Sequence, residues 1–201
     1  MAPLSKELEL LESAARYALA GAALVTPQLL SRPTPCSGWD LETLLDHLCD
    51  SIGVLGKAIA TGGVAASAAP PHPGPGPDPV TRLRGQTARL LAACAAAGPA
   101  ARRVAIGDRE LTASLVAVTA AIEITVHGWD IWVACGAGRP VPLGLAAVLL
   151  PIAPLLITPG TRPGLFADPV RLPGPACPGD QLVAFLGRRP HPLAAPGPGT
   201  A

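Results

Sequence analysis

Residues 111–135, LTASLVAVTAAIEITVHGWDIWVAC, restrict the fold more than any other part of the chain. As a helix, this segment is apolar on nearly every face, so it has to lie inside the protein with other elements around it. Its only charged or imidazole side chains are Glu123, His127 and Asp130. The segment therefore predicts a central helix that carries a small polar cluster into an apolar interior.

Three further segments have the residue spacing of amphipathic helices: 4–25, 39–60 and 79–97. Ala and Leu, both strong helix formers, dominate the apolar residues, and aromatic residues make up only 3% of the chain. The sequence thus predicts an all-α protein in which residues 1–157 form a four-helix bundle. Residues 62–79 are rich in Pro and Gly, which predicts an exposed, extended loop between the second and third helices.

The remaining segments are shorter and less regular. Residues 103–111 predict a short hairpin, and residues 143–156 a fifth helix interrupted by its prolines. Residues 158–201 predict an irregular C-terminal extension with a short helix near 180–186. We expect residues 187–201, at its end, to be a frayed tail.

Composition excludes several classes of protein. The 201 residues carry a net charge of +1 without a basic block that contains aromatic residues, which argues against a nucleic-acid partner. The acidic, helical N-terminus is unlike a signal peptide, and the most apolar stretch, Leu143–Ile157, is too short to cross a membrane. The five cysteines are scattered without a CxxC pair, which favours reduced thiols. We therefore expect a cytoplasmic protein without a membrane partner.

Glu123 and His127 are four residues apart, a spacing that places both side chains on one face of a helix. An ionised carboxylate buried alone is costly, so it must be paired, protonated or bound to a metal. His47, at the edge of the apolar stripe of the second helix, is the candidate third ligand. Two histidines and a carboxylate suit zinc, and also nickel, iron or manganese. On spacing alone, a structural Glu–His pair and a core or capping histidine explain these residues equally well.

Several other residues have two interpretations each. Asp130 either holds a ligand imidazole from behind or is a surface acid. Cys36, near the start of the second helix, either has a lowered pKa there or is a small buried thiol in a turn, the interpretation we favour. Trp39 is expected to serve packing. The other two histidines, His72 and His191, are expected to be solvated.

The sequence also resembles a known family. RPTPCSGWDLETLLDHL is similar to the second-helix signature of the actinobacterial DinB-like superfamily, a branch that includes the N-terminal domain of mycothiol-dependent maleylpyruvate isomerases. EITVHGWDIWVACG resembles the metal-binding helix of the same branch. GLFADPVRLPGPACPGDQLVAFLGRRP resembles the C-terminal stretch of its small "metal-binding protein" members. The resemblance thus extends over nearly the whole chain.

This resemblance implies a DinB-like four-helix bundle that holds a zinc or nickel-like ion. One histidine comes from the second helix, and a carboxylate and a histidine come from the later helix. Those positions correspond to His47, Glu123 and His127. Characterised relatives are isomerases and S-transferases that use mycothiol, bacillithiol or glutathione. The dedicated isomerases have a longer C-terminal domain, which argues against maleylpyruvate isomerisation itself in this chain.

We therefore expect a metal-dependent enzyme of the S-transferase or isomerase type, with His47, Glu123 and His127 as catalytic residues. It would activate mycothiol, another small thiol or water for attack on a small organic electrophile, in detoxification or natural-product tailoring. The expected partners are this small-molecule substrate and a second copy in a homodimer. Two alternatives remain open: a non-catalytic protein that binds metal or small molecules, and a metal-free bundle in which Glu123 and His127 act as acid and base in an isomerisation or cyclisation.

Overall fold

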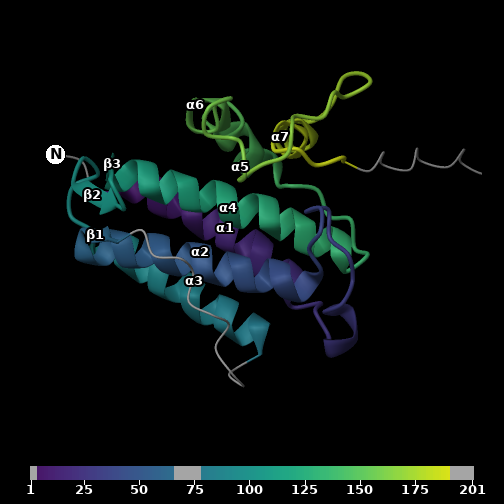
Figure 1. Ribbon diagram of the computed structural model, residues 1–201, viewed down its shortest axis with the longest axis horizontal. Helices are drawn as coiled ribbons and strands as arrows, with labels where there is room; N and C mark the ends of the chain where they lie inside the picture. Colours follow the sequence, from purple (N-terminus) through teal and green to yellow (C-terminus); the bar gives the residue numbers. More distant parts are fainter. Residues whose placement is uncertain (1–3, 66–77, 191–201) are drawn as a thin grey trace, which may run out of the picture.

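A computed structural model describes residues 4–65 and 78–190, and its four long helices form a bundle (Figure 1). These helices are α1 (Ser5–Ala22), α2 (Leu41–Thr61), α3 (Pro79–Ala96) and α4 (Ala113–Ala134). α1 contacts α4 and α3, and α2 contacts the same two helices, so the four close into a ring. The predicted all-α four-helix bundle is confirmed. His72 and His191 lie outside the described residues.

Side-chain caps set where the two central helices begin. The Asp40 carboxylate accepts a hydrogen bond from the Thr43 N–H at 2.9 Å, which starts α2 at Leu41. Thr112 accepts a hydrogen bond from the Leu115 N–H at 3.2 Å and starts α4 in the same way.

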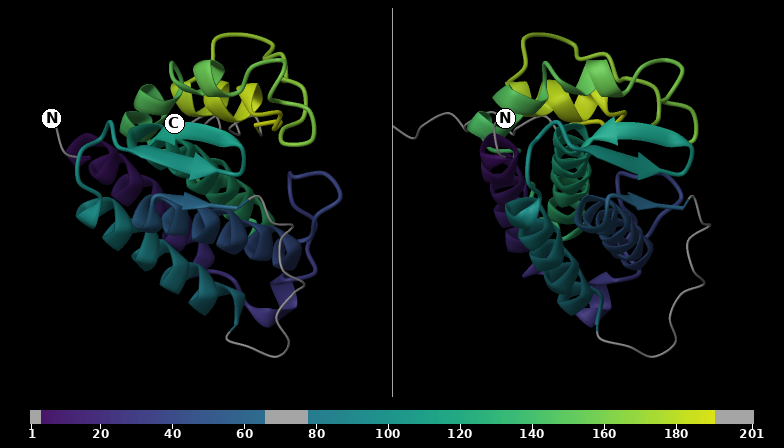
Figure 2. Two further views of the ribbon diagram at one scale, coloured as in Figure 1. Left: turned by 60° about the vertical axis from the view of Figure 1, so that its left-hand side comes forward. Right: turned by 90° about the vertical axis from the view of Figure 1, so that its left-hand side faces the viewer.

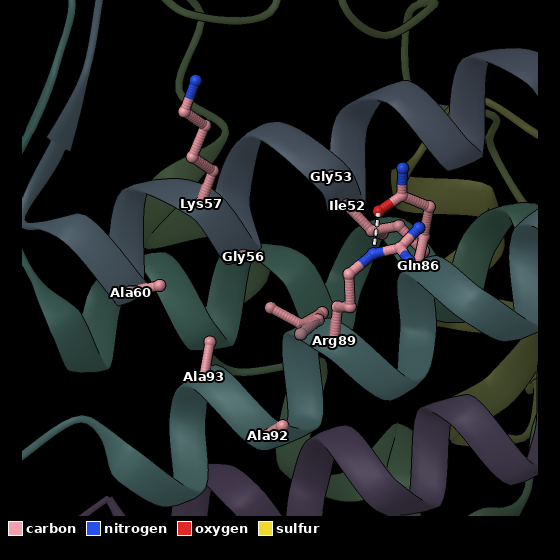
Figure 3. Close-up of a pocket in the computed structure, with 10 residues that line it drawn as sticks. Ile52, Gly53, Gly56, Lys57, Ala60, Gln86, Arg89, Ala92 and Ala93 are labelled. Carbon is pink, nitrogen blue, oxygen red and sulfur yellow. Dashed lines mark hydrogen bonds between the residues drawn. The ribbon is translucent and has the colours of Figure 1, made fainter.

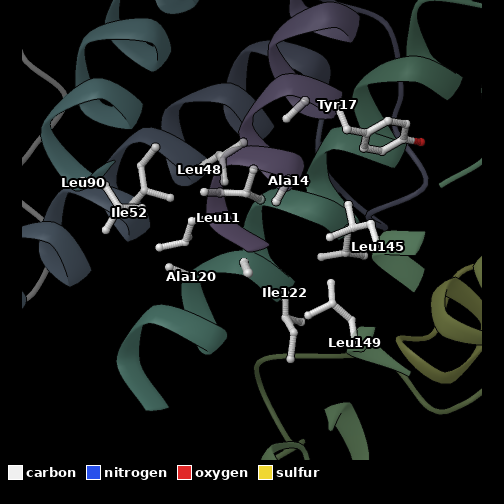
Figure 4. Close-up of a cluster of buried hydrophobic side chains, with 14 of the residues drawn as sticks. Leu11, Ala14, Tyr17, Leu48, Ile52, Leu90, Ala120, Ile122, Leu145 and Leu149 are labelled. Atoms are coloured by element: carbon white, nitrogen blue, oxygen red, sulfur yellow. The ribbon is translucent and has the colours of Figure 1, made fainter. Parts of the chain in front are cut away.

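The core fills the space between the four helices (Figure 4). Fully buried side chains come from every helix: Leu11, Ala14, Leu48, Ile52, Leu90 and Ala120. α4 is long and apolar enough to cross a membrane, but 78% of its most apolar window is buried inside the protein. Such burial is what the central helix of a bundle requires, as the sequence predicts.

A small sheet covers one end of the bundle. Its strands are β1 (Gly63–Val64), β2 (Arg103–Ile106) and β3 (Arg109–Thr112), in the order β1-β2-β3. β2 and β3 are antiparallel and confirm the predicted hairpin. β1 pairs with β2 in parallel, so the prediction of an exposed loop from residue 62 onward is wrong at its start. Gly62, with φ +87°, ends α2 and lets the chain turn back toward β2.

The C-terminal part lies on one side of the bundle, next to α4 (Figures 1 and 2). This part contains three short helices that follow α4: α5 (Leu143–Leu149), α6 (Ala153–Leu156) and α7 (Pro178–Phe185). A separate 3₁₀ turn, η1 (Pro27–Leu29), follows α1 within the bundle. α5 and α6 are separate helices because Pro151 and Pro154 interrupt the segment, as predicted. Leu145 and Leu149 are buried in the same cluster as Ile122 of α4 (Figure 4).

The predicted frayed tail from residue 187 onward is wrong for residues 187–190. Gly187, with φ +84°, turns the chain after α7, and any Cβ at this position would lie 2.7 Å from the Ala167 carbonyl oxygen. The next residue, Arg188, donates its N–H to the Val183 carbonyl at 2.9 Å and is only 5% exposed. The turn therefore directs a charged side chain into the protein.

An apolar groove of about 480 Å³ follows the outer side of α2 and α3 (Figure 3). Small residues such as Gly53 and Gly56 line it because the two helices lie close together. A Cβ on Gly56 would lie 3.3 Å from the Leu90 Cα. None of the described residues that line this groove is a His, Cys, Asp or Glu.

Candidate metal centre

His47, Glu123 and His127 converge on one point between α2 and α4. One ligand atom of each lies within 4.8 Å of the others. The Glu123 Oε2 atom is 3.4 Å from His127 Nε2 and 3.9 Å from His47 Nε2. In a tetrahedral site with metal–ligand distances of about 2.0 Å, two ligand atoms lie about 3.3 Å from each other. The distances from Glu123 Oε2 to the two imidazole nitrogens therefore suit one shared ion. The structure thus brings together the three residues expected as ligands.

The Glu123 carboxylate carries a buried oxygen atom, Oε2, that accepts no hydrogen bond from any of the described residues. A buried carboxylate oxygen without a partner costs free energy, which a cation between the three side chains would remove. Two imidazole nitrogens and one carboxylate oxygen are ligands that a divalent transition metal accepts. The residues present therefore fit a divalent metal ion.

Asp130 holds the imidazole of His127 from the side opposite Glu123. Its Oδ2 atom lies 3.0 Å from His127 Nδ1, and its side chain is fully buried. The interpretation of Asp130 as a surface acid is wrong, because the segment after α7 covers it. A carboxylate on Nδ1 keeps the proton there and leaves Nε2 free to act as a ligand.

Arg188 extends the series of contacts that runs from Glu123 through His127 to Asp130. Residue spacing in the sequence did not identify it as part of the site. Its Nη2 donates to Asp130 Oδ2 at 2.9 Å, its Nε to Oδ1 at 3.3 Å, and its Nη1 to the Leu186 carbonyl at 2.8 Å. No helical spacing links Asp130 to a residue 58 positions later. The usable signal was the GRRP end of the C-terminal stretch, which falls within the family resemblance.

The pKa values follow from these contacts. Burial alone lowers the pKa of His127, but the hydrogen bond to Asp130 and the contact with the Glu123 carboxylate outweigh burial and raise that pKa to about 9. Burial favours the neutral form of Glu123, yet the His127 contact and the charges of both histidines hold its pKa below the usual value. Burial, and then the charge of His127, lower the pKa of His47. A proton on His127 therefore supplies the positive charge that a metal ion would bring.

A pocket of about 510 Å³ opens over these ligands. One wall is the segment before α2, where the Trp39 ring lies 4.5 Å from the His47 ring, centroid to centroid. The opposite wall comes from the C-terminal part, residues 164–167 and 187–188. Cys36 also lines the pocket, but burial raises the pKa of its thiol, so the alternative of a lowered pKa is wrong. All five cysteines are free, as expected for reduced thiols.

Comparison with known proteins points in the same direction. The family model described as the mycothiol maleylpyruvate isomerase N-terminal domain matches residues 10–132. That range includes all three candidate ligands and ends before the segment that supplies Arg188. Two uncharacterized proteins, from two strains of Mycobacterium tuberculosis, are each 33% identical over 175 residues, which cover 83% of this chain and 88% of theirs. No solved structure gives a significant match.

Proposed function

This chain belongs to the family of the mycothiol maleylpyruvate isomerase N-terminal domain, and we propose that it is a metal-dependent enzyme which joins a small thiol to an organic electrophile. The observation that carries the proposal is the buried Oε2 atom of Glu123, which has no partner among the described residues and faces two histidines. If Glu123 and His127 formed only a structural pair in this geometry, the Oε2 atom would stay without a hydrogen bond. If Glu123 were a metal ligand, the ion would satisfy that atom.

His47, Glu123 and His127 would hold the ion, with zinc as the first candidate and nickel, iron or manganese as alternatives. When bound, such an ion supplies Lewis acidity, which lowers the pKa of a thiol or water ligand to near neutrality. The family points to mycothiol or another low-molecular-weight thiol as the cosubstrate. The pocket volume of about 510 Å³ is in the range of small-molecule sites.

The residues behind the ligands would keep the site in one geometry. Asp130 fixes the orientation and tautomer of His127, and Arg188 fixes Asp130 with two hydrogen bonds. Trp39 packs against the ring of His47, which is 39% exposed and otherwise faces solvent. The chain's own contribution is therefore orientation of the ligands and exclusion of water from one side of the pocket.

The test is metal analysis together with thiol-dependent turnover. Protein purified without chelator should contain about one metal ion per chain, identified by mass spectrometry of the metals. It should consume mycothiol or a substitute thiol in the presence of a panel of electrophiles, and chelator should abolish this reaction. Absence of stoichiometric metal, together with turnover that survives chelation, would falsify the proposal.

The 3.4 Å contact between Glu123 and His127 also favours a second candidate, a metal-free acid/base pair. In that case chelator has no effect, and Glu123→Gln abolishes an isomerisation or cyclisation. A non-catalytic binding protein would hold the metal and turn over none of the electrophiles. The homodimer and the cytoplasmic location stay predictions from the sequence.

A further inference from the structure

The pocket over the candidate metal centre is poor in positive charge. All 15 Lys and Arg residues fall within the described segments, because residues 1–3, 66–77 and 191–201 contain neither type. Among the described residues that line the pocket, Arg188 is the single Lys or Arg. Its guanidinium already donates two hydrogen bonds to Asp130 and one to the Leu186 carbonyl. Among the described residues, the pocket therefore has no Lys or Arg whose charge is not already paired with a buried carboxylate.

The formal charges of the buried groups lead to the same conclusion. With both histidines neutral, as they are when they bind a metal, Glu123 and Asp130 contribute two formal negative charges and Arg188 one positive charge, which leaves the chain with one negative charge at this site. A divalent ion and a thiolate together add one positive charge, so the loaded site is neutral. A dianion would then enter a partly buried pocket without a counter-charge, at a considerable cost in desolvation.

The surfaces that face the pocket are instead suited to apolar groups. Trp39 lies over the two histidines, with its ring centroid 4.5 Å from His47 and 6.2 Å from His127. Across the pocket, Leu165 is 72% exposed, so its side chain is accessible to a bound molecule. Its neighbour Phe166 lines both this pocket and an adjoining cavity of about 430 Å³. An apolar body next to the reacting position would contact aromatic and aliphatic side chains on both sides.

We infer that the electrophile is an uncharged molecule with an apolar or aromatic body, held between Trp39 and the Leu165–Phe166 segment. Dicarboxylates of the maleylpyruvate type are then not substrates of this chain. The inference rests on the proposed function, since it concerns the second substrate of the same site.

Binding of an unreactive matched pair tests it without any turnover. Dimethyl phthalate and phthalate share an aromatic body and differ in charge, and neither reacts with the free cysteines. Ligand-observed NMR on the protein loaded with both zinc and mycothiol, the state in which the site is neutral, should show the ester binding at least about tenfold more tightly than the dianion. Equal or tighter binding of phthalate, or failure of the ester to bind, overturns the inference.

Two variants of one exposed residue make the test specific. Leu165→Arg places a cation at the pocket, and Leu165→Gln is the neutral control of similar size; neither should affect folding, because the side chain is 72% exposed. Phthalate affinity should rise several-fold in Leu165→Arg and stay unchanged in Leu165→Gln. If Leu165→Arg does not improve phthalate binding, lack of a free cation is not what excludes dianions.

The same preparations separate this inference from the proposed function. Metal content and thiol-dependent turnover are measured on each protein. A chain that holds metal and consumes thiol, but prefers dianions, overturns the inference alone. If the chain binds the ester but holds no metal, and its turnover persists in the presence of chelator, the proposed function is overturned.

Discussion

α2 borders two cavities of similar size that differ in their chemistry. The groove shared with α3 has a volume of about 480 Å³, and the pocket shared with α4 about 510 Å³ (Figure 3 shows the groove). None of the described residues that line the groove has a buried side-chain polar atom without a partner, and Arg89 Nε donates a hydrogen bond to Gln86 Oε1. In the pocket the buried Oε2 atom of Glu123 has no partner among the described residues. Volume therefore does not distinguish a site from a packing gap, whereas an unsatisfied buried ligand atom does.

Loss of a ligand from the pocket should produce the largest difference between the two cavities. In Glu123→Ala we expect metal affinity to fall by more than about 100-fold, because removal of an outer partner alone costs up to that amount. Gln86→Ala, in the groove, is the matched control and should keep one ion per chain. Metal content after dialysis, together with zinc titration in a competing chelator, measures both. Equal metal content in the two variants would contradict the assignment of the site.

Arg188 should affect both stability and metal binding. Arg188→Met leaves Asp130 buried without its partner, which should cost about 3–5 kcal/mol of unfolding free energy and about tenfold in metal affinity. Arg188→Lys should recover part of both. Urea unfolding and zinc titration provide the two measurements.

Arg162 provides the control for this effect. It is 8% exposed, packs over the Phe185 ring in the same C-terminal part, and does not line the pocket over the ligands. Arg162→Met should therefore lower stability but leave metal affinity unchanged. A fall in metal affinity equal to that of Arg188→Met would show that Arg188 acts only through general stability.

Stability of the metal-free protein should depend on the protonation of His127. The pKa of this residue is about 9 in the folded chain and 6.5 in an unfolded one, so its contribution is fully present below pH 6.5 and lost as pH rises through 9. We expect a loss on the order of 1–3 kcal/mol between these values. Urea unfolding with chelator at both pH values measures it, with His127→Gln as the control. An equal loss in the control would assign the pH dependence to other groups.

These residues also show how far sequence reasoning reaches. Glu123 and His127 lie on one helix, so their spacing alone predicts that they are neighbours. His47 comes from another helix, whose rotation and register relative to α4 no spacing rule gives. Its place in the site therefore came from the family resemblance.

Residue spacing predicts neither Arg188 nor β1, for different reasons. Arg188 follows a Pro/Gly-rich segment that is typical of a frayed end, and its burial depends on the Gly187 turn and on Asp130, a tertiary partner. β1 is two residues long, too short for any periodic pattern, and exists because the hairpin edge lies next to the end of α2.

The smallest predicted effects test whether the groove is a packing feature. A Cβ on Gly56 would lie 3.3 Å from the Leu90 Cα, a backbone atom that cannot move away alone. A Cβ on Gly53 would instead lie 3.2 Å from the Gln86 Nε2 atom, at the far end of a flexible side chain. Alanine gains roughly 0.5–1 kcal/mol over glycine within a helix.

Gly53→Ala should therefore stabilise the protein by up to about 1 kcal/mol, because Gln86 can adopt another rotamer. Gly56→Ala should be neutral or destabilising by about 1 kcal/mol, since the helices would have to move apart. Both variants should keep full metal content. Thermal unfolding resolves the difference in sign, and a loss of metal in either would show that the groove and the pocket are coupled through α2 rather than independent.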